Sequence, residues 1–327
     1  MGVGALIAEQ VSYVRVVPKG STAHAATRAP AALDDVRLEE PDEPELDSVD
    51  MELSVDEVRT FDAVGSHLAD GRIITGGSHH RVILFTFDDG PDRRSTPRLL
   101  QHLDDYGVKA LFFVTTNKVH GAGDRIRAQA EILRDIVRRG HMVGNHTHDH
   151  NALPLIDTEQ VIAEIETAQS AIEEVLGLRP RLFRPPGGTR SPRVDRLIAD
   201  RGYTQVLWNL GTGDFQVRTA EEVVDIWSRT LARRERENGE RGGIVLLHDT
   251  HPWSVEAFPL IMQELRRRNC DLLEQGEELF DVISDPIAFF QARDEDPSAL
   301  ADPLQLSPEM LELRQRRARE IARRHCE

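Results

Sequence analysis

The feature that most constrains the fold is the repeated succession of a short apolar run and an amphipathic stretch between Arg81 and Arg268. The first run, RVILFTFDDGPD, has β-branched and aromatic residues followed by turn formers. This pattern is typical of a strand buried on both faces, and we expect the strand to end near Phe87. Strands that alternate with helices form parallel βαβ units. The number of units predicts an α/β fold, a distorted (β/α) barrel with six to seven parallel strands.

The later runs predict where the other elements lie. Ser95 is expected to cap a helix that ends at Tyr106, with Pro97 in its first turn. A long helix is expected at residues 158–175, where apolar residues recur on one face. Further strands are predicted at residues 109–115, 141–145, 181–183, 204–210 and 242–249, and further helices at residues 124–139, 192–201, 220–234 and 255–268.

Composition divides the chain into three parts. Between Asp34 and Glu57 twelve acidic residues stand against one arginine, within a stretch rich in alanine and proline. Such a segment buries too little apolar area to offset chain entropy, so we expect residues 1–58 to be a disordered acidic leader. Residues 59–292 carry the strand and helix pattern and are expected to form the main domain. Residues 293–327 are expected to be a charged tail with a short helix.

The composition also excludes several classes of protein. No apolar run approaches the roughly 20 residues of a membrane helix, so no membrane span is expected. No basic and aromatic pattern indicates nucleic-acid binding, and no protein partner is evident. Cys270 and Cys326 stand far apart, so we expect two unconnected thiols rather than a disulfide framework or a zinc-binding CxxC pair.

The start of the chain contains no recognisable signal peptide. The apolar stretch from Val3 to Ala8 has no basic region before it. Glu9 and Gln10 interrupt the stretch before it reaches the ~7 to 15 residues of a signal-peptide core. These residues therefore assign no compartment to the protein.

Side chains suited to catalysis collect where the predicted strands end. The carboxyl ends of parallel strands meet at one edge of a sheet, and active sites of such folds lie there. The candidates are Asp88 and Asp89 after the first strand, His146, His148 and His150 after residues 141–145, then Arg184, Asp214, and His248 with Asp249.

The segment NHTHDH at residues 145–150 holds more imidazoles than surface solvation requires. His146 and His150 are four residues apart and can point the same way on a helical turn, and zinc accepts imidazole nitrogen together with a carboxylate. A metal site is therefore predicted, with a polar histidine-rich loop as the alternative. A zincin would need Glu where this chain has Thr147, so the third ligand and the base must come from elsewhere.

Asp88 and Asp89 stand side by side at the end of a buried strand. Adjacent carboxylates in an apolar environment resist joint ionisation unless positive charge neutralises them, which a metal ion and Arg184 would do. We therefore expect one aspartate to bind the metal and the other to be a base that Arg184 keeps ionised. A glycosidase pair is the competing interpretation, but neighbouring strand residues rarely flank a bond at the ~5 to 9.5 Å that glycosidases use.

Four motifs resemble those of the polysaccharide deacetylases, the NodB-homology domain of carbohydrate esterase family 4. TFDDG at residues 86–90 is similar to the first motif of that family, and HTxxH at residues 146–150 to the second. RPPGG at residues 184–188 is similar to the third, and LLHD at residues 246–249 to the fifth. The motifs occur in the family's order between about Arg81 and Leu273.

The resemblance implies a metal-dependent hydrolase whose catalytic domain is residues 59–292. Asp89, His146 and His150 would bind one divalent ion, with zinc expected and cobalt or nickel as alternatives. The substrate would be an acetylated glycan, from which the enzyme removes N-acetyl or O-acetyl groups. The family favours the cell envelope or export. Chitin-like polymers, peptidoglycan and exopolysaccharide are not distinguished by these residues.

The resemblance also implies the roles of the remaining motif residues. Asp88 would be the general base, oriented by Arg184, and His248 the general acid. Leu246 would line the pocket for the acetyl methyl group. The backbone N–H of Gly187 would help to hold the oxyanion.

The fourth motif departs from the family's Asp-x-x-Asp-Trp. The sequence GTGDF at residues 211–215 keeps only the second aspartate, Asp214, and has Phe215 at the tryptophan position. Asp214 would hold the imidazole of His248 and raise its basicity. The third motif has Gly187 where an aromatic residue is usual, so the sugar subsites are expected to differ. Trp253, in the loop after His248, is a candidate to stack on a sugar ring.

Two rival functions are considered. A non-catalytic carbohydrate-binding descendant of the family is motivated by the altered third and fourth motifs, but every expected catalytic residue type is present. An iron oxygenase with two histidines and one carboxylate is motivated by ligand type alone. Enzymes of that class have a β-rich jelly-roll fold, and the alternation of strands and helices argues against it.

Overall fold

In the computed structural model, which describes residues 73–284, 286 and 308–326, the sheet is centred on β3 (Val82–Asp88). All seven residues of β3 are buried, as the apolar run predicts. β4 (Leu111–Val114) and β9 (Gly242–His248) pair with β3 on either side, both parallel to it. β10 (Asp281–Val282) also pairs in parallel with the start of β3.

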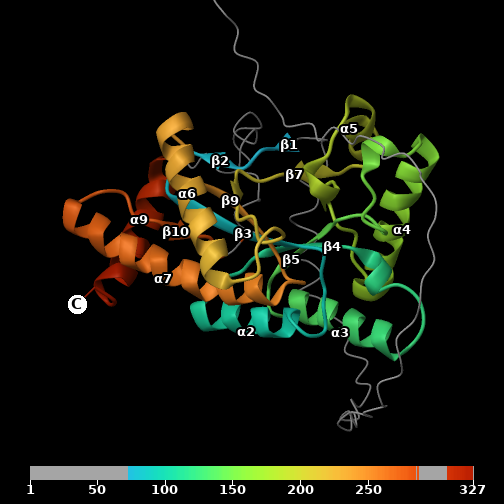
Figure 1. The fold of residues 1–327 in the computed structure, drawn as a ribbon, viewed down its shortest axis with the longest axis horizontal. Helices are drawn as coiled ribbons and strands as arrows, with labels where there is room; N and C mark the ends of the chain where they lie inside the picture. The colour runs from blue at the N-terminus through green and yellow to red at the C-terminus, as the bar shows by residue number, and fades with distance from the viewer. Residues whose placement is uncertain (1–72, 285, 287–307, 327) are drawn as a thin grey trace, which may run out of the picture. The chain divides into compact units, whose positions relative to one another are not determined.

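The full sheet has the order β1-β7-β6-β5-β4-β3-β9-β2, with β8 paired to β9 (Figure 1). β2 runs antiparallel to β9, and the other pairings are parallel. The remaining strands are β1 (Ile73–Ile74), β2 (Gly77–Ser78), β5 (Met142–Asn145), β6 (Leu182–Phe183), β7 (Thr204–Val206) and β8 (Leu210–Gly211).

Two short connections make this sheet curl. β7 and β8 are consecutive in sequence, yet β7 lies towards one end of the strand order and β8 pairs with β9 near the other. Residues 207–209 join them and can span at most about 14 Å. β1 and β2 likewise lie at opposite ends, joined by residues 75 and 76. The sheet therefore curves until its ends approach each other, and the predicted distorted barrel of mostly parallel strands is confirmed.

The predicted strand at residues 204–210 is wrong in one respect, because it is broken into β7 and β8. Its residues pair with both ends of the curled sheet, which one straight strand cannot do. Residues 207–209 between them belong to no strand, although the backbone N–H of Leu207 still donates to the carbonyl of Ile74 in β1.

The predicted helices are present. Ser95 occupies the N-cap position of the first, but its hydroxyl does not cap the helix and instead donates to the carbonyl of Asp249 at 2.5 Å, so that detail of the prediction is wrong. The helices are α2 (Thr96–Tyr106), α3 (Asp124–Arg138), α4 (Thr158–Leu176), α5 (Pro192–Ala199), α6 (Ala220–Asn238) and α7 (Pro252–Gln275).

The alternation of side chains along β3 separates two apolar clusters. Ile83, Phe85 and Phe87 belong to a large cluster outside the barrel, which α2, α3, α6 and α7 cover. Val82 and Leu84 belong to a smaller cluster inside the curl. Since successive residues of a strand face opposite sides, the inner face of β3 continues after Leu84 with polar residues. The site described below is built there.

The C-terminal residues correct the expectation for the cysteines. Cys270 in α7 and Cys326 form a disulfide, so they are not unconnected thiols. The expected tail helix exists as α9 (Pro308–Arg323) and packs against the end of α7, with Ala318 and Ala322 on Leu279. This packing brings the second cysteine to the first, although 56 positions separate them in sequence.

The leader expected at residues 1–58 lies outside the described residues. Within the described part of the chain, no helix is long and apolar enough to cross a membrane. That part belongs to one contact unit, Met51–Glu327.

The disulfide is expected to stabilise the protein measurably. Closing a loop of 56 residues corresponds to about 4 kcal/mol in the chain-entropy model. We expect the double variant Cys270→Ser/Cys326→Ser to melt several degrees below the wild type in a thermal scan. A reductant should lower the melting temperature of the wild type and leave that of the double variant unchanged. A wild-type protein whose melting temperature ignores the reductant would contradict this assignment.

Candidate active site

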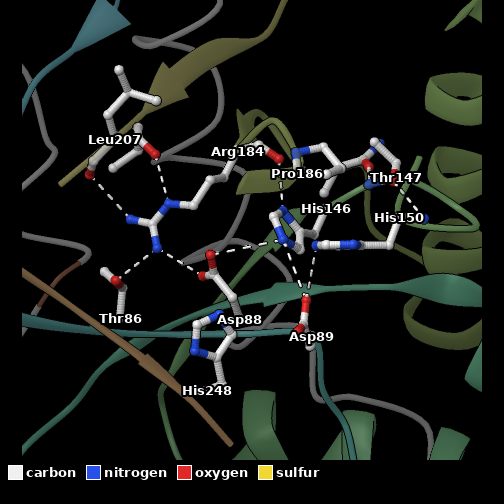
Figure 2. Close-up of polar contacts among 12 residues, drawn as sticks. Thr86, Asp88, Asp89, His146, Thr147, His150, Arg184, Pro186, Leu207 and His248 are labelled. Atoms are coloured by element: carbon white, nitrogen blue, oxygen red, sulfur yellow. Dashed lines mark hydrogen bonds and ion pairs between the residues drawn. The ribbon is translucent and has the colours of Figure 1, made fainter. Parts of the chain in front are cut away.

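The register of β3 against β9 sets the geometry of the site. Asp88 pairs with His248, and Thr86 with Leu246. Residues paired in a parallel ladder point to the same side of the sheet, so these four side chains share the inner face of the barrel. Figure 2 shows Asp88 and His248 close to Asp89 and the two histidines of the loop after β5.

Arg184, just after β6, is completely buried and holds Asp88. Its Nη1 donates to Asp88 Oδ1 at 2.7 Å and to the hydroxyl of Thr86 at 2.8 Å. Nε donates to the carbonyl of Val206 at 2.8 Å, and Nη2 to that of Leu207 at 3.1 Å. The guanidinium thus has a partner on each nitrogen, as a buried charge requires.

Asp89, His146 and His150 form a group of three possible metal ligands. One donor atom of each lies within 4.8 Å of the others. Asp89 Oδ1 is 3.5 Å from His146 Nε2 and 3.3 Å from His150 Nε2 (Figure 2). Within the described part of the chain no other group of histidine, cysteine or acidic residues comes together in this way.

The loop that carries the histidines is not the helical turn that their spacing suggested. Thr147 has φ 70° and His150 has φ 61°, both left-handed, and Asp89 has φ 75°. Left-handed backbone is unfavourable for residues with a Cβ and is concentrated at functional sites. The two rings therefore converge through an irregular loop rather than through helical periodicity.

The chemistry of this donor set fits a divalent cation. His146 Nδ1 lies 2.7 Å from the carbonyl of Arg184 and must donate to it, which leaves the lone pair of Nε2 facing Asp89. Asp89 Oδ1 is buried without a hydrogen-bond partner in the described structure. Burial lowers the pKa of His150, which favours the neutral imidazole that binds metals.

The ionisation state of Asp89 also favours binding of a cation. Its burial opposes ionisation, but the neighbouring imidazoles, chiefly that of His146, outweigh burial and hold the pKa of Asp89 well below its ordinary value. An ionised carboxylate beside two imidazoles is a common ligand set for zinc and for other divalent transition metals.

Asp214, just after β8, is buried and holds His248. Its Oδ1 accepts from His248 Nδ1 at 2.8 Å, and its Oδ2 accepts from the backbone N–H of His248 at 2.7 Å. Burial of His248 opposes its charged form, but Asp214 outweighs burial and raises the pKa of His248 to about 9. Burial likewise opposes ionisation of Asp214, and His248 lowers its pKa in return. His248 is therefore protonated at neutral pH.

The structure also places the four expected substrate contacts. Leu246 is 7% exposed and precedes His248 by two residues on the inner face of β9. Gly187 has φ 61° in the short helix η3 (Pro186–Gly188), and only one side-chain atom lies within 4 Å of where a Cβ would stand. Phe215 is 56% exposed, with its ring 6.2 Å from that of His248.

Trp253 is less available to stack on a sugar ring than the sequence suggested. Its indole N–H donates to the carbonyl of Asp214 at 2.6 Å. Its ring stacks on His251, and the guanidinium of Arg218 lies over the same ring in a cation–π contact. It is therefore a partner of the residue that holds His248 as well as a candidate sugar contact.

Two candidates from the strand ends lie outside the ligand group. Asp249 is buried and accepts from Thr96 at 2.5 Å, and burial raises its pKa to about 7. His148 is not in the group of three possible ligands, and its Nδ1 lies 3.0 Å from the hydroxyl of Thr116. Both contribute to neighbouring loops rather than to the group of metal ligands.

Several functional contacts were missed at the level of sequence. Thr86 shares the Arg184 guanidinium, and Ser254 donates to Asp214 Oδ2 at 2.6 Å. Lys118 donates to the carbonyl of Asp89 at 2.6 Å. Lys118 is one of three lysines among 40 basic residues, which is a weak signal, whereas nothing in the sequence marks Ser254.

Comparison with known proteins points to one family. Residues 75–206 match the family model described as polysaccharide deacetylase. The chain is 30% identical over 205 residues to a peptidoglycan-N-acetylglucosamine deacetylase of Bacillus cereus, an alignment that covers 62% of this chain and 90% of the relative. It is 29% identical to the peptidoglycan-N-acetylmuramic acid deacetylase PdaC of Bacillus subtilis, covering 60% of this chain but only 38% of that relative.

A solved structure is similar over much the same region. The chitin deacetylase of the fungus Colletotrichum lindemuthianum superposes with a TM-score of 0.53 and 25% identity. The superposition covers 61% of this chain and 87% of that one.

The pair of His248 and Asp214 predicts a specific titration. In Asp214→Asn the imidazolium loses its anionic partner, so the pKa of His248 should fall from about 9 towards or below its ordinary 6.5. The chemical shift of the His248 ring, followed by NMR against pH, measures this directly. Since the pKa is raised in the folded state, the stabilisation from this pair is present below pH 6.5 and is lost as pH rises through 9. Asp225→Asn, an exposed change on α6, is the control; an unshifted His248 in Asp214→Asn would refute the pairing.

Proposed function

The chain belongs to the polysaccharide deacetylase family, and we propose that it is a metal-dependent hydrolase that removes N-acetyl or O-acetyl groups from an amino-sugar polysaccharide. The observation that carries the proposal is that Asp88, held by Arg184, and His248, held by Asp214, are neighbours beside one group of three ligands. The names of the relatives support peptidoglycan or chitin as the substrate class.

Asp89, His146 and His150 would hold one divalent ion, with zinc expected and cobalt or nickel as alternatives. Such an ion supplies Lewis acidity, which polarises the acyl oxygen and lowers the pKa of a water molecule. The protein contributes the fixed positions of the three donors and the hydrogen bond from His146 to the carbonyl of Arg184 that fixes one of them.

Asp88 is proposed as the general base. Arg184 occupies its Oδ1, so Oδ2 remains free and lies 3.7 Å from His146 Nε2, on the side of the ligand group. A water molecule that attacks an acetyl carbon at this position can pass its proton to Oδ2. The hydrogen bond from Arg184 prevents the carboxylate from turning away.

His248 is proposed as the general acid, which protonates the departing amine or alkoxide. The anion of Asp214 keeps its imidazole charged at neutral pH and leaves Nε2 to donate. Proton donation of this kind contributes roughly 10² to 10⁴ in rate.

The substrate contacts follow from the surroundings of these groups. The N–H of Gly187 is proposed to donate to the oxyanion, and Leu246 to contact the acetyl methyl group. Phe215 and Trp253 are proposed to contact the sugar, Phe215 through its exposed ring beside His248. The open space at Gly187, where the family usually has an aromatic residue, leaves room for a substituted sugar.

We also propose that the protein works in the cell envelope or after export. The Cys270–Cys326 disulfide supports this, because disulfides form and persist in oxidising compartments and are rare in the cytosol. The relatives named for action on peptidoglycan support the same placement.

Release of acetate from N-acetylated glycans tests the proposal. Chelator-treated protein should release none, and zinc or cobalt should restore release. His248→Ala should reduce turnover ~10² to 10⁴-fold with metal content unchanged. His102→Ala is the control, since that histidine pairs with Glu256 on the helical surface. Metal-loaded wild type that binds a glycan but releases no acetate would favour the non-catalytic carbohydrate-binding alternative.

A further inference from the structure

Glu164 lies in α4, outside the group of ligands, but its carboxylate is bonded to the loop that carries His150. Its Oε2 accepts the backbone N–H of His148 at 3.0 Å and of Asp149 at 2.8 Å. Its Oε1 accepts the side-chain amide of Asn151 at 2.5 Å. These three donors belong to residues before and after His150 in the sequence. One buried carboxylate therefore holds the backbone on both sides of this proposed ligand.

His150 needs such support more than His146 does. The ring of His146 is buried and fixed by its hydrogen bond to the carbonyl of Arg184. The side chain of His150 is 42% exposed, and its described contacts are Asp89 Oδ1 and the ring of His146. The position of its Nε2 therefore depends on the backbone of the loop.

The backbone of this loop is shaped around an anion. Thr147 is left-handed, and the next two N–H groups, of His148 and Asp149, point at the same oxygen of Glu164. Successive N–H groups next to a left-handed residue form a concave nest that binds anions. On the other side of the loop, Asn145 Oδ1 accepts the N–H of Thr147 at 2.8 Å.

Apolar packing does not replace these hydrogen bonds. An open pocket of about 310 Å³ lies against the loop, and His148, Asp149, Asn151 and Glu164 are among its lining residues. On the side of this pocket the loop therefore lacks close-packed side chains. Within the described part of the chain no arginine or lysine forms a hydrogen bond or ion pair with Glu164, so the loop itself satisfies this buried carboxylate.

We propose that Glu164 is a positioning residue that fixes residues 148–151 and thereby aims His150 at Asp89. The inference rests on the proposed metal site, because it concerns how tightly that site holds its ion. Loss of a group that orients a metal ligand typically weakens metal binding 10 to 100-fold.

Three variants separate orientation from charge and from general damage. Glu164→Ala removes both oxygens. Glu164→Gln keeps one oxygen for the two backbone N–H groups and turns its amide towards Asn151, whose side chain can rotate to present an oxygen. Glu166→Ala is the matched control, because Glu166 is two residues away on α4, is 56% exposed and pairs with Arg201.

The experiment measures zinc dissociation constants of the metal-free proteins by competition with a chelating dye. We expect Glu164→Ala to bind zinc 10 to 100-fold more weakly, with Glu164→Gln and Glu166→Ala close to the wild type. In the metal-free state, amide hydrogen exchange of His148 and Asp149 should be faster in Glu164→Ala alone. This second readout reports on the loop without any metal.

The outcomes distinguish the two claims. Equal zinc affinity and equal amide exchange in the wild type and Glu164→Ala would overturn the role of Glu164 and leave the metal site intact. Wild type that binds no zinc, cobalt or nickel would overturn the proposed metal site, and this role with it. Affinity lost in Glu164→Ala but not restored in Glu164→Gln would also contradict positioning, because it would show that the negative charge itself is required.

Discussion

A completely buried guanidinium is the constraint on which the site depends. Arg184 is completely buried, and an unpaired charge there would be strongly destabilising. The fold meets this requirement with the Asp88 carboxylate, the Thr86 hydroxyl and two backbone carbonyls. Asp88 and Thr86 come from β3, whereas the carbonyls come from the end of β7, so the guanidinium ties the two together across the curled sheet.

The surrounding chain is arranged to make this contact. The break after β7 frees the carbonyl of Leu207 from the ladder, and that carbonyl accepts from Arg184. The ring of Phe113 lies 4.1 Å from the guanidinium carbon, and it fits there because Gly144 has no Cβ, which would stand 2.5 Å from that ring. Closure of the barrel, the packing inside it and the orientation of Asp88 therefore depend on the same residues. A second carboxylate, Asp214, fixes His248 in the same way from β8.

The parts of this arrangement that follow from local rules could be predicted from the sequence. Buried strands, amphipathic helices and reactive residues at strand ends depend on periodicity and on the direction of parallel strands. Contacts that depend on how distant segments of the chain pack together could not be predicted. The disulfide forms because α9 packs on α7, and the strand is broken because the sheet closes. The contacts of Glu164 arise because α4 lies beside an irregular loop. The left-handed backbone of Thr147 was missed because a β-branched residue rarely adopts it.

The role proposed for Asp88 is that of a base held by Arg184 rather than a metal ligand. The most direct measurement is acetate release by zinc-loaded Asp88→Asn, with zinc content determined on the same folded sample. Asparagine keeps the shape and the oxygen that accepts from Arg184 but cannot take a proton. We expect one zinc ion per chain, as in the wild type, with turnover reduced ~10² to 10⁴-fold. Turnover close to that of the wild type, or loss of zinc from the variant, would contradict it.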